Sequence, residues 1–213
     1  MLARTHGRQI DLESKLSAVE SFYGELAVPV RYQITPASQP HLLEALLLAR
    51  GYTTDSPTAV QTCPLRALVV VPMPPGISIE ITPGPTGTWW ATWQSSLGIN
   101  PIRATAVDAL FRRILPAKAF ATVSIDDIAA AVALGVLEDR WLGIFNMATV
   151  PALRRRGAGR TALAALARWA AERGATTGYL QVDLDNQPAT RLYRDAGFIE
   201  SFRYVYLTRN PRD

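Results

Sequence analysis

Three apolar runs between residues 119 and 149, separated by two short polar turns, constrain the fold of this chain more than any other feature. The runs read AFATVSI, IAAAVALGV and WLGIFNMAT, and the turns occupy residues 126–127 and 138–140. Short runs rich in apolar and β-branched residues, bounded by polar turns, are typical of β-strands. We therefore predict three antiparallel strands joined by tight turns.

Helices and strands are also predicted on both sides of these three strands. A β-like run at residues 77–81 and helical patterns at 89–97 and 104–115 precede them. A helix, a strand, a helix and a strand follow, at residues 157–173, 178–184, 187–196 and 198–208. This order predicts an α/β fold with a mixed sheet of the α+β kind.

The N-terminal region carries a pattern that returns near the C-terminus. The segment QITPASQP at residues 33–40 has a counterpart in QVDLDNQP at residues 181–188, and each follows a helical pattern. A partial internal repeat would explain the likeness, and the alternative is that two ordinary βα units share a few residues. Because a Pro- and Gly-rich stretch follows the first segment, we divide the chain into two domains, residues 1–72 and 73–213.

Charge and composition narrow the class of protein. The chain is 48% apolar with a formal charge of +4, and the residues after position 150 carry 11 arginines against six acidic residues. Such a segment attracts an anion, either a phosphate-bearing small molecule or a nucleic acid. No apolar leader or membrane-length apolar run is present, so we expect a cytoplasmic protein with no membrane partner. Cys63, His6 and His41 are too few for a metal site, and Cys63 is expected to be structural.

The stretch PALRRRGAGRT at residues 151–161 is the most informative for function. It lies between a predicted strand and a predicted helix, and Gly157 and Gly159 allow the backbone to fold tightly there. The start of a helix offers free N–H groups and a partial positive charge to phosphate oxygens. Arg156, Arg160 and the Thr161 hydroxyl could add further donors. The alternative is that the glycines only end a strand and the arginines form a solvated face.

These residues make the chain similar to the GNAT superfamily, the coenzyme A-dependent N-acetyltransferases. The family signature [QR]-x-x-G-x-[GA] is matched by Arg154, Gly157 and Gly159. A second family element, a strand and an Asn before a helix with A-x-x-L-Y-x-x-x-G-F, is matched by residues 180–198. The resemblance is strong over residues 119–208 and weaker over 77–115. It implies the GNAT fold, with residues 1–72 as a degenerate second copy.

The resemblance also implies how acetyl-CoA would bind, as the cosubstrate. The fourth and fifth strands of the family fold splay apart and admit the pantetheine arm, which pairs with main-chain groups of one strand. The residues implied as cofactor-binding are Met147, Ala148, Thr149, Arg154, Arg155, Arg156, Gly157, Ala158, Gly159, Arg160, Thr161, Asn186 and Tyr193. The main-chain N–H of Ala148 or a neighbour is implied to polarise the thioester carbonyl.

Two catalytic residues, Tyr193 and Asn186, follow from the same resemblance. A phenol with a pKa of about 10 stays protonated at neutral pH and can donate a hydrogen bond or a proton to a departing thiolate. The helical spacing around Tyr193 also fits a core aromatic residue.

The general base is left open. Many relatives carry a glutamate early in the fourth strand, where this chain has GIF at residues 143–145. Glu80, Asp183 and a chain of waters are the alternatives. Trp89, Trp90 and Trp93 lie where the acceptor pocket often forms in this fold, although their spacing favours packing in the core.

The resulting hypothesis is an N-acetyltransferase that acts on a small-molecule or peptide amine. A coenzyme A-binding or structural module without activity is the main alternative, because the glutamate is missing. Nucleic-acid binding is disfavoured, since consecutive arginines point in different directions on a helix. A homodimer is one role for the N-terminal half.

Overall fold

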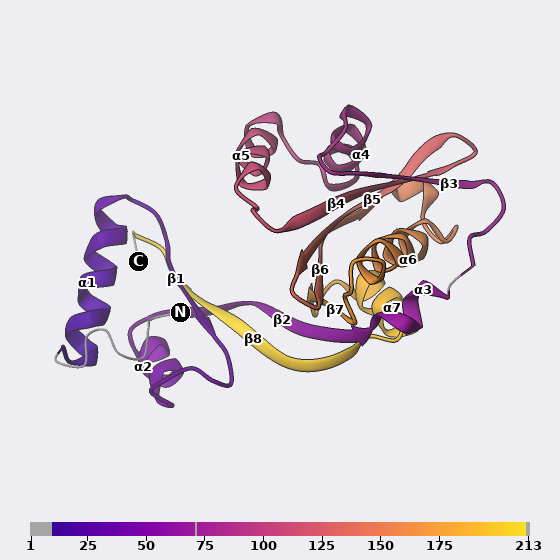
Figure 1. Cartoon of the computed structure of the whole chain (residues 1–213). Coiled ribbons are helices and arrows are strands. Elements are labelled where there is room, and N and C mark those ends of the chain that lie inside the picture. The colour runs from indigo at the N-terminus through magenta and orange to yellow at the C-terminus, as the bar shows by residue number, and fades with distance from the viewer. Residues whose placement is uncertain (1–9, 71, 212–213) are drawn as a thin grey trace. The chain divides into compact units, whose positions relative to one another are not determined.

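The structure is a computed structural model that describes residues 10–70 and 72–211 (Figure 1). It contains two compact units: residues 59–201 form one, and residues up to 58 together with those from 202 onward form the other. His6 and Val71 lie outside the described residues. The proposed division into residues 1–72 and 73–213 follows a repeat in the sequence, whereas the two compact units are defined by contacts between residues. The division therefore stays a prediction.

The sheet of the larger unit is built around a meander of antiparallel strands. β3 (Ile77–Thr82), β4 (Ala117–Ile125), β5 (Ile128–Glu138) and β6 (Trp141–Thr149) pair in sequence order. β7 (Thr177–Asp183) then pairs with β6 in parallel. The β4–β5 turn places Asp126 and Asp127 at φ values of 49° and 64°. Aspartate tolerates this left-handed conformation, which suits a tight hairpin turn.

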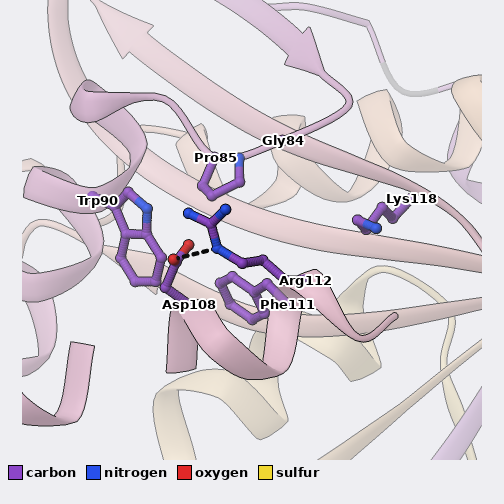
Figure 2. A pocket seen from close by; sticks show the side chains of 7 residues that line it. All are labelled: Gly84, Pro85, Trp90, Asp108, Phe111, Arg112 and Lys118. Atoms are coloured by element: carbon purple, nitrogen blue, oxygen red, sulfur yellow. Dashed lines mark hydrogen bonds and ion pairs between the residues drawn. The ribbon is translucent and has the colours of Figure 1, made fainter. Parts of the chain in front are cut away.

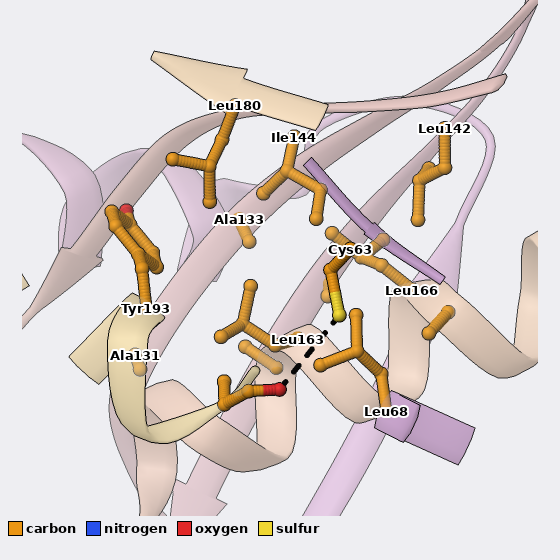
Figure 3. Close-up of a cluster of buried hydrophobic side chains, with 14 of the residues drawn as sticks. Cys63, Leu68, Ala131, Ala133, Leu142, Ile144, Leu163, Leu166, Leu180 and Tyr193 are labelled. Atoms are coloured by element: carbon orange, nitrogen blue, oxygen red, sulfur yellow. Dashed lines mark hydrogen bonds between the residues drawn. The ribbon is translucent and has the colours of Figure 1, made fainter. Parts of the chain in front are cut away.

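Helices cover both faces of this sheet. α4 (Gly87–Leu97) and α5 (Pro101–Arg112) cover one face, and α3 (Leu65–Val69), α6 (Ala158–Ala171) and α7 (Gln187–Asp195) cover the other (Figure 1). Figure 3 shows the core beneath α6, where Leu163 and Leu166 meet Leu142 of β6 and Leu180 of β7. The single cysteine, Cys63, is fully buried in this core, which confirms the expected structural role.

The smaller unit has a core of its own. It contains α1 (Leu12–Glu25), β1 (Val30–Ile34) and α2 (Leu43–Ala49). It also includes the first part of β2 (Thr53–Pro64) and the last part of β8 (Ile199–Arg209). β1 pairs antiparallel with β8, and the strand order there is β1-β8-β2. Leu16, Leu47, Tyr52 and Leu207 are among the buried side chains.

The predicted order of elements from residue 77 to the last strand is confirmed, as is the mixed α/β sheet. The helix–strand–helix–strand order of the N-terminal region is also present. The short helix α3 after Pro64 was not predicted, because five residues carry too little periodicity to identify a helix. No helix in the described ranges is long and apolar enough to cross a membrane.

Candidate functional site

The first feature of the site is a separation of two parallel strands. Pairing between β6 and β7 runs from Trp141 with Thr177 to Ile144 with Leu180, and within the described residues it goes no further. Both strands continue, β6 to Thr149 and β7 to Asp183. The end of β6 therefore has main-chain groups on its β7 side that the sheet does not use.

A bulge in β6 marks the start of this separated part. Asn146 has a φ of 49°, and the register between β5 and β6 shifts beside it. Such a bulge re-aims the strand and leaves a residue out of the ladder. Beyond it, Ala148 and Thr149 pair with β5 again, while Met147 packs against the core under α6. The three strand residues predicted to contact the cofactor arm thus border the gap.

The start of α6 lies just beyond the end of β6. Gly157 precedes the helix with a φ of 88°, and its lack of a side chain leaves the helix without a side-chain cap. The first helical hydrogen bond runs from the N–H of Thr161 to the carbonyl of Gly157, at 2.9 Å. The N–H groups of Ala158, Gly159 and Arg160 have no acceptor one turn earlier, so they are free for an anion.

Close packing explains the second glycine of the loop. A Cβ at Gly159 would lie 3.2 Å from Cδ2 of Leu192 and 3.6 Å from Oγ1 of Thr149. A residue without a side chain therefore lets the start of α6 approach both α7 and the end of β6. The start of α6, the separated end of β6 and α7 meet at this point.

The four arginines around the loop are all exposed, but they differ in their contacts. Nη2 of Arg156 lies 3.0 Å from the Asp126 carboxylate in the β4–β5 turn. Arg154 donates weakly to the carbonyl of Thr149, at 3.4 Å. Arg155 has a φ of 63°, so it turns the chain rather than continuing a strand. Arg160 lines a cavity of about 490 Å³ together with Ala67, Val70 and Pro72.

Two other predicted contact residues have structural roles. Asn186 caps α7, and its side-chain oxygen accepts a hydrogen bond of 3.2 Å from the N–H of Ala189. Thr161 is only 2% exposed and lies within the buried side of α6. Their contacts with a cofactor stay predictions.

Tyr193 is a buried phenol on α7. Its side chain is 7% exposed, and its ring packs edge-to-face on Phe198 with centroids 5.9 Å apart. Burial raises the pKa of Tyr193 to about 12. Figure 3 shows it at the margin of the core cluster, near Leu180. Because burial disfavours the phenolate, Tyr193 is a hydrogen-bond donor across the neutral range.

The stretch where the family resemblance implies a glutamate, residues 143–145, begins with a glycine that has no room for a side chain. A Cβ at Gly143 would lie 2.6 Å from Cε2 of Phe145 and 2.8 Å from the hydroxyl oxygen of Tyr179. Tyr179 is the β7 partner of Gly143 in the sheet register. Sequence reasoning missed Tyr179, because only the pairing of two strands distant in sequence brings it over Gly143.

The two carboxylates considered as bases lie apart from that position. Glu80 is exposed on β3 and paired with Thr122 of β4. Asp183 ends β7, and one of its oxygens accepts a hydrogen bond of 2.9 Å from the N–H of Asp185. Within the described residues, neither carboxylate is hydrogen-bonded to Tyr193.

The tryptophans pack mainly as core residues, as their spacing favoured. Trp89 is fully buried, and Trp93 is 4% exposed. Trp90 is half-buried and stacks on Phe111, with centroids 5.5 Å apart. Figure 2 shows Trp90 beside the Asp108–Arg112 ion pair at a cavity of about 400 Å³. In the described ranges, no three His, Cys, Asp or Glu side chains gather to hold a metal ion.

Comparison with known proteins shows which family the chain belongs to. A family profile described as "Probable histone acetyltransferase Rv0428c C-terminal" matches residues 10–207. The chain belongs to this family. A search of curated proteins found no match to this member of the Rv0428c C-terminal family.

Solved structures show that this family member has the GNAT fold. A GCN5-related N-acetyltransferase from Kribbella flavida is 19% identical, with a TM-score of 0.67 over 92% of this chain and 74% of that one. A functionally unknown conserved protein from Staphylococcus epidermidis is 11% identical, with a TM-score of 0.71 over 94% and 81%. A tandem GNAT protein from the clavulanic acid biosynthesis pathway is 16% identical, with a TM-score of 0.72 over 92% and 69%.

Proposed function

We propose that the protein is an acyl-CoA-dependent N-acyltransferase that transfers acetyl from acetyl-CoA to a primary amine. The observation that carries this proposal is the meeting of two features, the separated end of β6 and the uncapped start of α6. An extended thioester arm needs main-chain partners and a pyrophosphate needs free N–H groups. The free main-chain groups of β6 and the free N–H groups of α6 lie next to each other here.

The residues of the loop suit the anionic part of acetyl-CoA. The N–H groups of Ala158, Gly159 and Arg160 would hold phosphate oxygens, and Arg154, Arg155 and Arg156 would add charge at the rim. Met147, Ala148 and Thr149 would pair with the arm, with Asn186 and Tyr193 beside it. Bound acetyl-CoA supplies a reactive thioester and a thiol leaving group.

Transfer is proposed to occur directly between the two bound substrates. Cys63 is the chain's one cysteine, and burial in the core raises the pKa of its thiol, so it is not available as an acyl-accepting thiolate. Tyr193 then donates a hydrogen bond to the departing thiolate. Because its pKa of about 12 lies above that of a thiol, at about 8.5, the phenol stabilises the thiolate while keeping its own proton, and the thiolate is protonated by solvent.

The amine must lose a proton before it attacks, since alkylamines have a pKa of about 10.4. Glu80, Asp183 and ordered water stay alternatives for the acceptor of this proton. The side chain that fills the position over Gly143 is a phenol, which is no base at neutral pH. The absence of a glutamate from residues 143–145 supports the rival function, a module that binds coenzyme A without catalysing transfer.

The domain division, the cellular location and the oligomeric state are also part of the proposal. Residues 1–72 are proposed as a degenerate GNAT half and residues 73–213 as the N-acetyltransferase domain. The likeness to a tandem GNAT protein supports the repeat. We also propose a cytoplasmic location, and a homodimer as one role of the N-terminal half.

Titration with acetyl-CoA tests the proposal. We expect saturable binding by calorimetry, weakened at least about tenfold in an Arg155→Glu, Arg160→Glu variant, because two charges at the phosphate site are reversed. An Arg103→Glu, Arg113→Glu variant is the matched control, because it reverses two exposed charges at α5, away from the loop. Absence of binding by the unaltered protein would contradict the proposal, and binding without turnover on any amine would favour the rival module.

A further inference from the structure

A cavity of about 400 Å³ lies between α4, α5 and the start of β4. The seven residues that line it are labelled in Figure 2, and none of them belongs to the proposed cofactor site. Cavities that hold small organic ligands have volumes of about 300–1,000 Å³. The cavity is therefore large enough for a molecule with one or two rings.

Four segments meet around this cavity at one end of the sheet. Thr82, the last residue of β3, pairs with Phe120 of β4, so the loop after β3 lies near the start of β4. The Thr82 hydroxyl donates to the carbonyl of Gly84, at 2.7 Å, which holds this loop in place. α4 begins after the loop, and α5 ends shortly before β4. The lining residues are thus held by a hydrogen-bonded loop, two helices and a strand.

One wall of the cavity is aromatic. Trp90 of α4 stacks on Phe111 of α5, with centroids 5.5 Å apart and the ring planes inclined by 26°. Trp90 is half-buried, whereas Phe111 is 5% exposed, so the indole keeps surface that a ligand can cover. Pro85 adds apolar surface beside it. Such a wall favours a ligand with a planar apolar body.

The other wall carries two cations. Nε of Arg112 lies 2.8 Å from the Asp108 carboxylate, which leaves both terminal nitrogens of the guanidinium without a hydrogen bond in the described part of the chain. The Lys118 ammonium donates to the carbonyl of Ile114, at 2.7 Å, and forms no ion pair with a carboxylate of the described residues. With Asp108 as the one carboxylate of the lining, the net charge is +1. This wall therefore favours an anion.

We infer that the cavity is a binding site for a small aromatic carboxylate. The ring of the ligand stacks on Trp90, and its carboxylate accepts hydrogen bonds from the terminal nitrogens of Arg112 and from Lys118. A neutral ring gains only the stacking, and a carboxylate without a ring gains only the charge. The proposed acyl transfer uses none of these three side chains, so the inference does not depend on it.

This cavity and the proposed acetyl-CoA site lie at opposite ends of the sheet. Lys118 pairs with Val136 of β5, and Val136 pairs with Gly143 of β6. The strand then rises about 20 Å from Gly143 to Thr149, where the thioester arm is proposed to bind. The aromatic carboxylate and acetyl-CoA can therefore be bound at the same time.

Three probes test the inference without any acyl transfer. 2-Naphthoate has both the rings and the charge, 2-naphthamide has the rings alone, and acetate has the charge alone. We expect 2-naphthoate to shift the NMR signal of the Trp90 indole N–H in a saturable way, with an affinity at least about fivefold above that of either other probe. Equal affinities for 2-naphthoate and 2-naphthamide would overturn the inference, as would an unshifted Trp90 signal.

Variants locate the binding. Arg112→Gln and Lys118→Gln are each expected to weaken 2-naphthoate binding about three- to fivefold and to leave 2-naphthamide binding unchanged. Glutamine at position 118 can still donate to the carbonyl of Ile114. Arg103→Gln is the matched control, because it removes one exposed cation farther along α5. Unchanged 2-naphthoate binding in both cavity variants would overturn the inference. If a variant does not fold, the three probes on the unaltered protein still decide.

Coenzyme A distinguishes this site from the proposed cofactor site. We expect saturating coenzyme A to change the Kd for 2-naphthoate by less than about twofold, because about 20 Å of strand separates the two sites. Competition between 2-naphthoate and coenzyme A would overturn the inference. Failure of acetyl-CoA to bind, with 2-naphthoate binding intact, would contradict only the transferase proposal.

Discussion

Burial decides the chemistry of the residue proposed to stabilise the departing thiolate. Tyr193 sits almost wholly within the core, and its pKa of about 12 lies above that of an exposed phenol. The same burial gives the ring a packing role against Phe198. Both roles that the sequence allowed are therefore compatible, because only the hydroxyl has to reach the reacting thiolate.

Replacing Tyr193 by Phe separates these roles. We expect kcat to fall about a hundredfold with the amine that screening finds to be the best acceptor, because the hydrogen-bond donor to the departing thiolate is lost while the ring stays. The Kd for coenzyme A should stay within about twofold of the original. Since the acid form persists up to pH about 12, Tyr193 should cause no alkaline loss of kcat below pH about 10. An unchanged kcat would remove Tyr193 from the mechanism.

The exposed carboxylate of Asp126 pairs with Arg156, an arginine that is proposed to attract phosphate. Asp126 holds Arg156 at 3.0 Å, and both side chains are about half exposed or more. Exposed ion pairs contribute little to stability, so breaking this one costs about 0–1 kcal/mol. The charge of Asp126 nevertheless repels any phosphate bound beside Arg156.

Asp126→Asn should therefore bind coenzyme A about two- to threefold more tightly, by calorimetry at low salt, since Arg156 is released and one repulsive charge is removed. Asparagine also tolerates the positive φ of this turn. Asp139→Asn is the matched control, because Asp139 holds a similar conformation in the β5–β6 turn. Tighter binding in both variants would point to net charge alone.

At the scale of elements, the site depends on where one pair of strands stops. β6 is held by β5 along most of its length, but its β7 side is paired only as far as Ile144. The bulge at Asn146 gives the physical reason, because it disturbs the ladder at the point where the strands part.

Hydrogen exchange should report this arrangement. We expect amides within residues 145–147 to exchange faster than those within 141–144, because fewer of them lie in a two-sided ladder. Saturating coenzyme A should slow exchange in the first segment and leave the second unchanged. Uniform protection of β6 without ligand would argue against an open strand edge.

Local patterns made most of these elements predictable. The meander between residues 117 and 149 shows apolar runs and polar turns, and α6 shows a helical stripe ended by Gly174. The tight turn before α6 was also predictable, since a glycine before a helix acts through its own backbone. The contact of Tyr179 with Gly143 was not, because it depends on the β6–β7 register.

At the scale of the whole molecule, the smaller unit has a polar network as well as its apolar core. Glu20 of α1 accepts hydrogen bonds from Arg50 and Tyr52, and it lies 3.2 Å from Arg209 at the end of β8. The Glu20 side chain is 15% exposed. Removing the Glu20 carboxylate leaves Arg209 and the Tyr52 hydroxyl without this partner, while Arg50 keeps its ion pair with Glu13.

Glu20→Ala should lower the free energy of unfolding of this unit by about 2 kcal/mol, measured by urea denaturation. Glu20→Gln should lose less, because its amide oxygen can still accept a hydrogen bond. The Kd for acetyl-CoA should not change, since the proposed cofactor residues all belong to the larger unit. Equal stability of the Ala variant would mean that water replaces the network at no cost.

The sequence by itself determined the order of helices and strands apart from the short helix α3, the GNAT resemblance, and the glycines and arginines of the loop at residues 151–161. These features act through the local backbone and through residues close together in the chain. Only the tertiary structure decided that Arg156 pairs with Asp126, that Tyr179 fills the place over Gly143, and that β6 and β7 part after Ile144. Each of these depends on segments distant in sequence that the strand register or the packing of loops brings together.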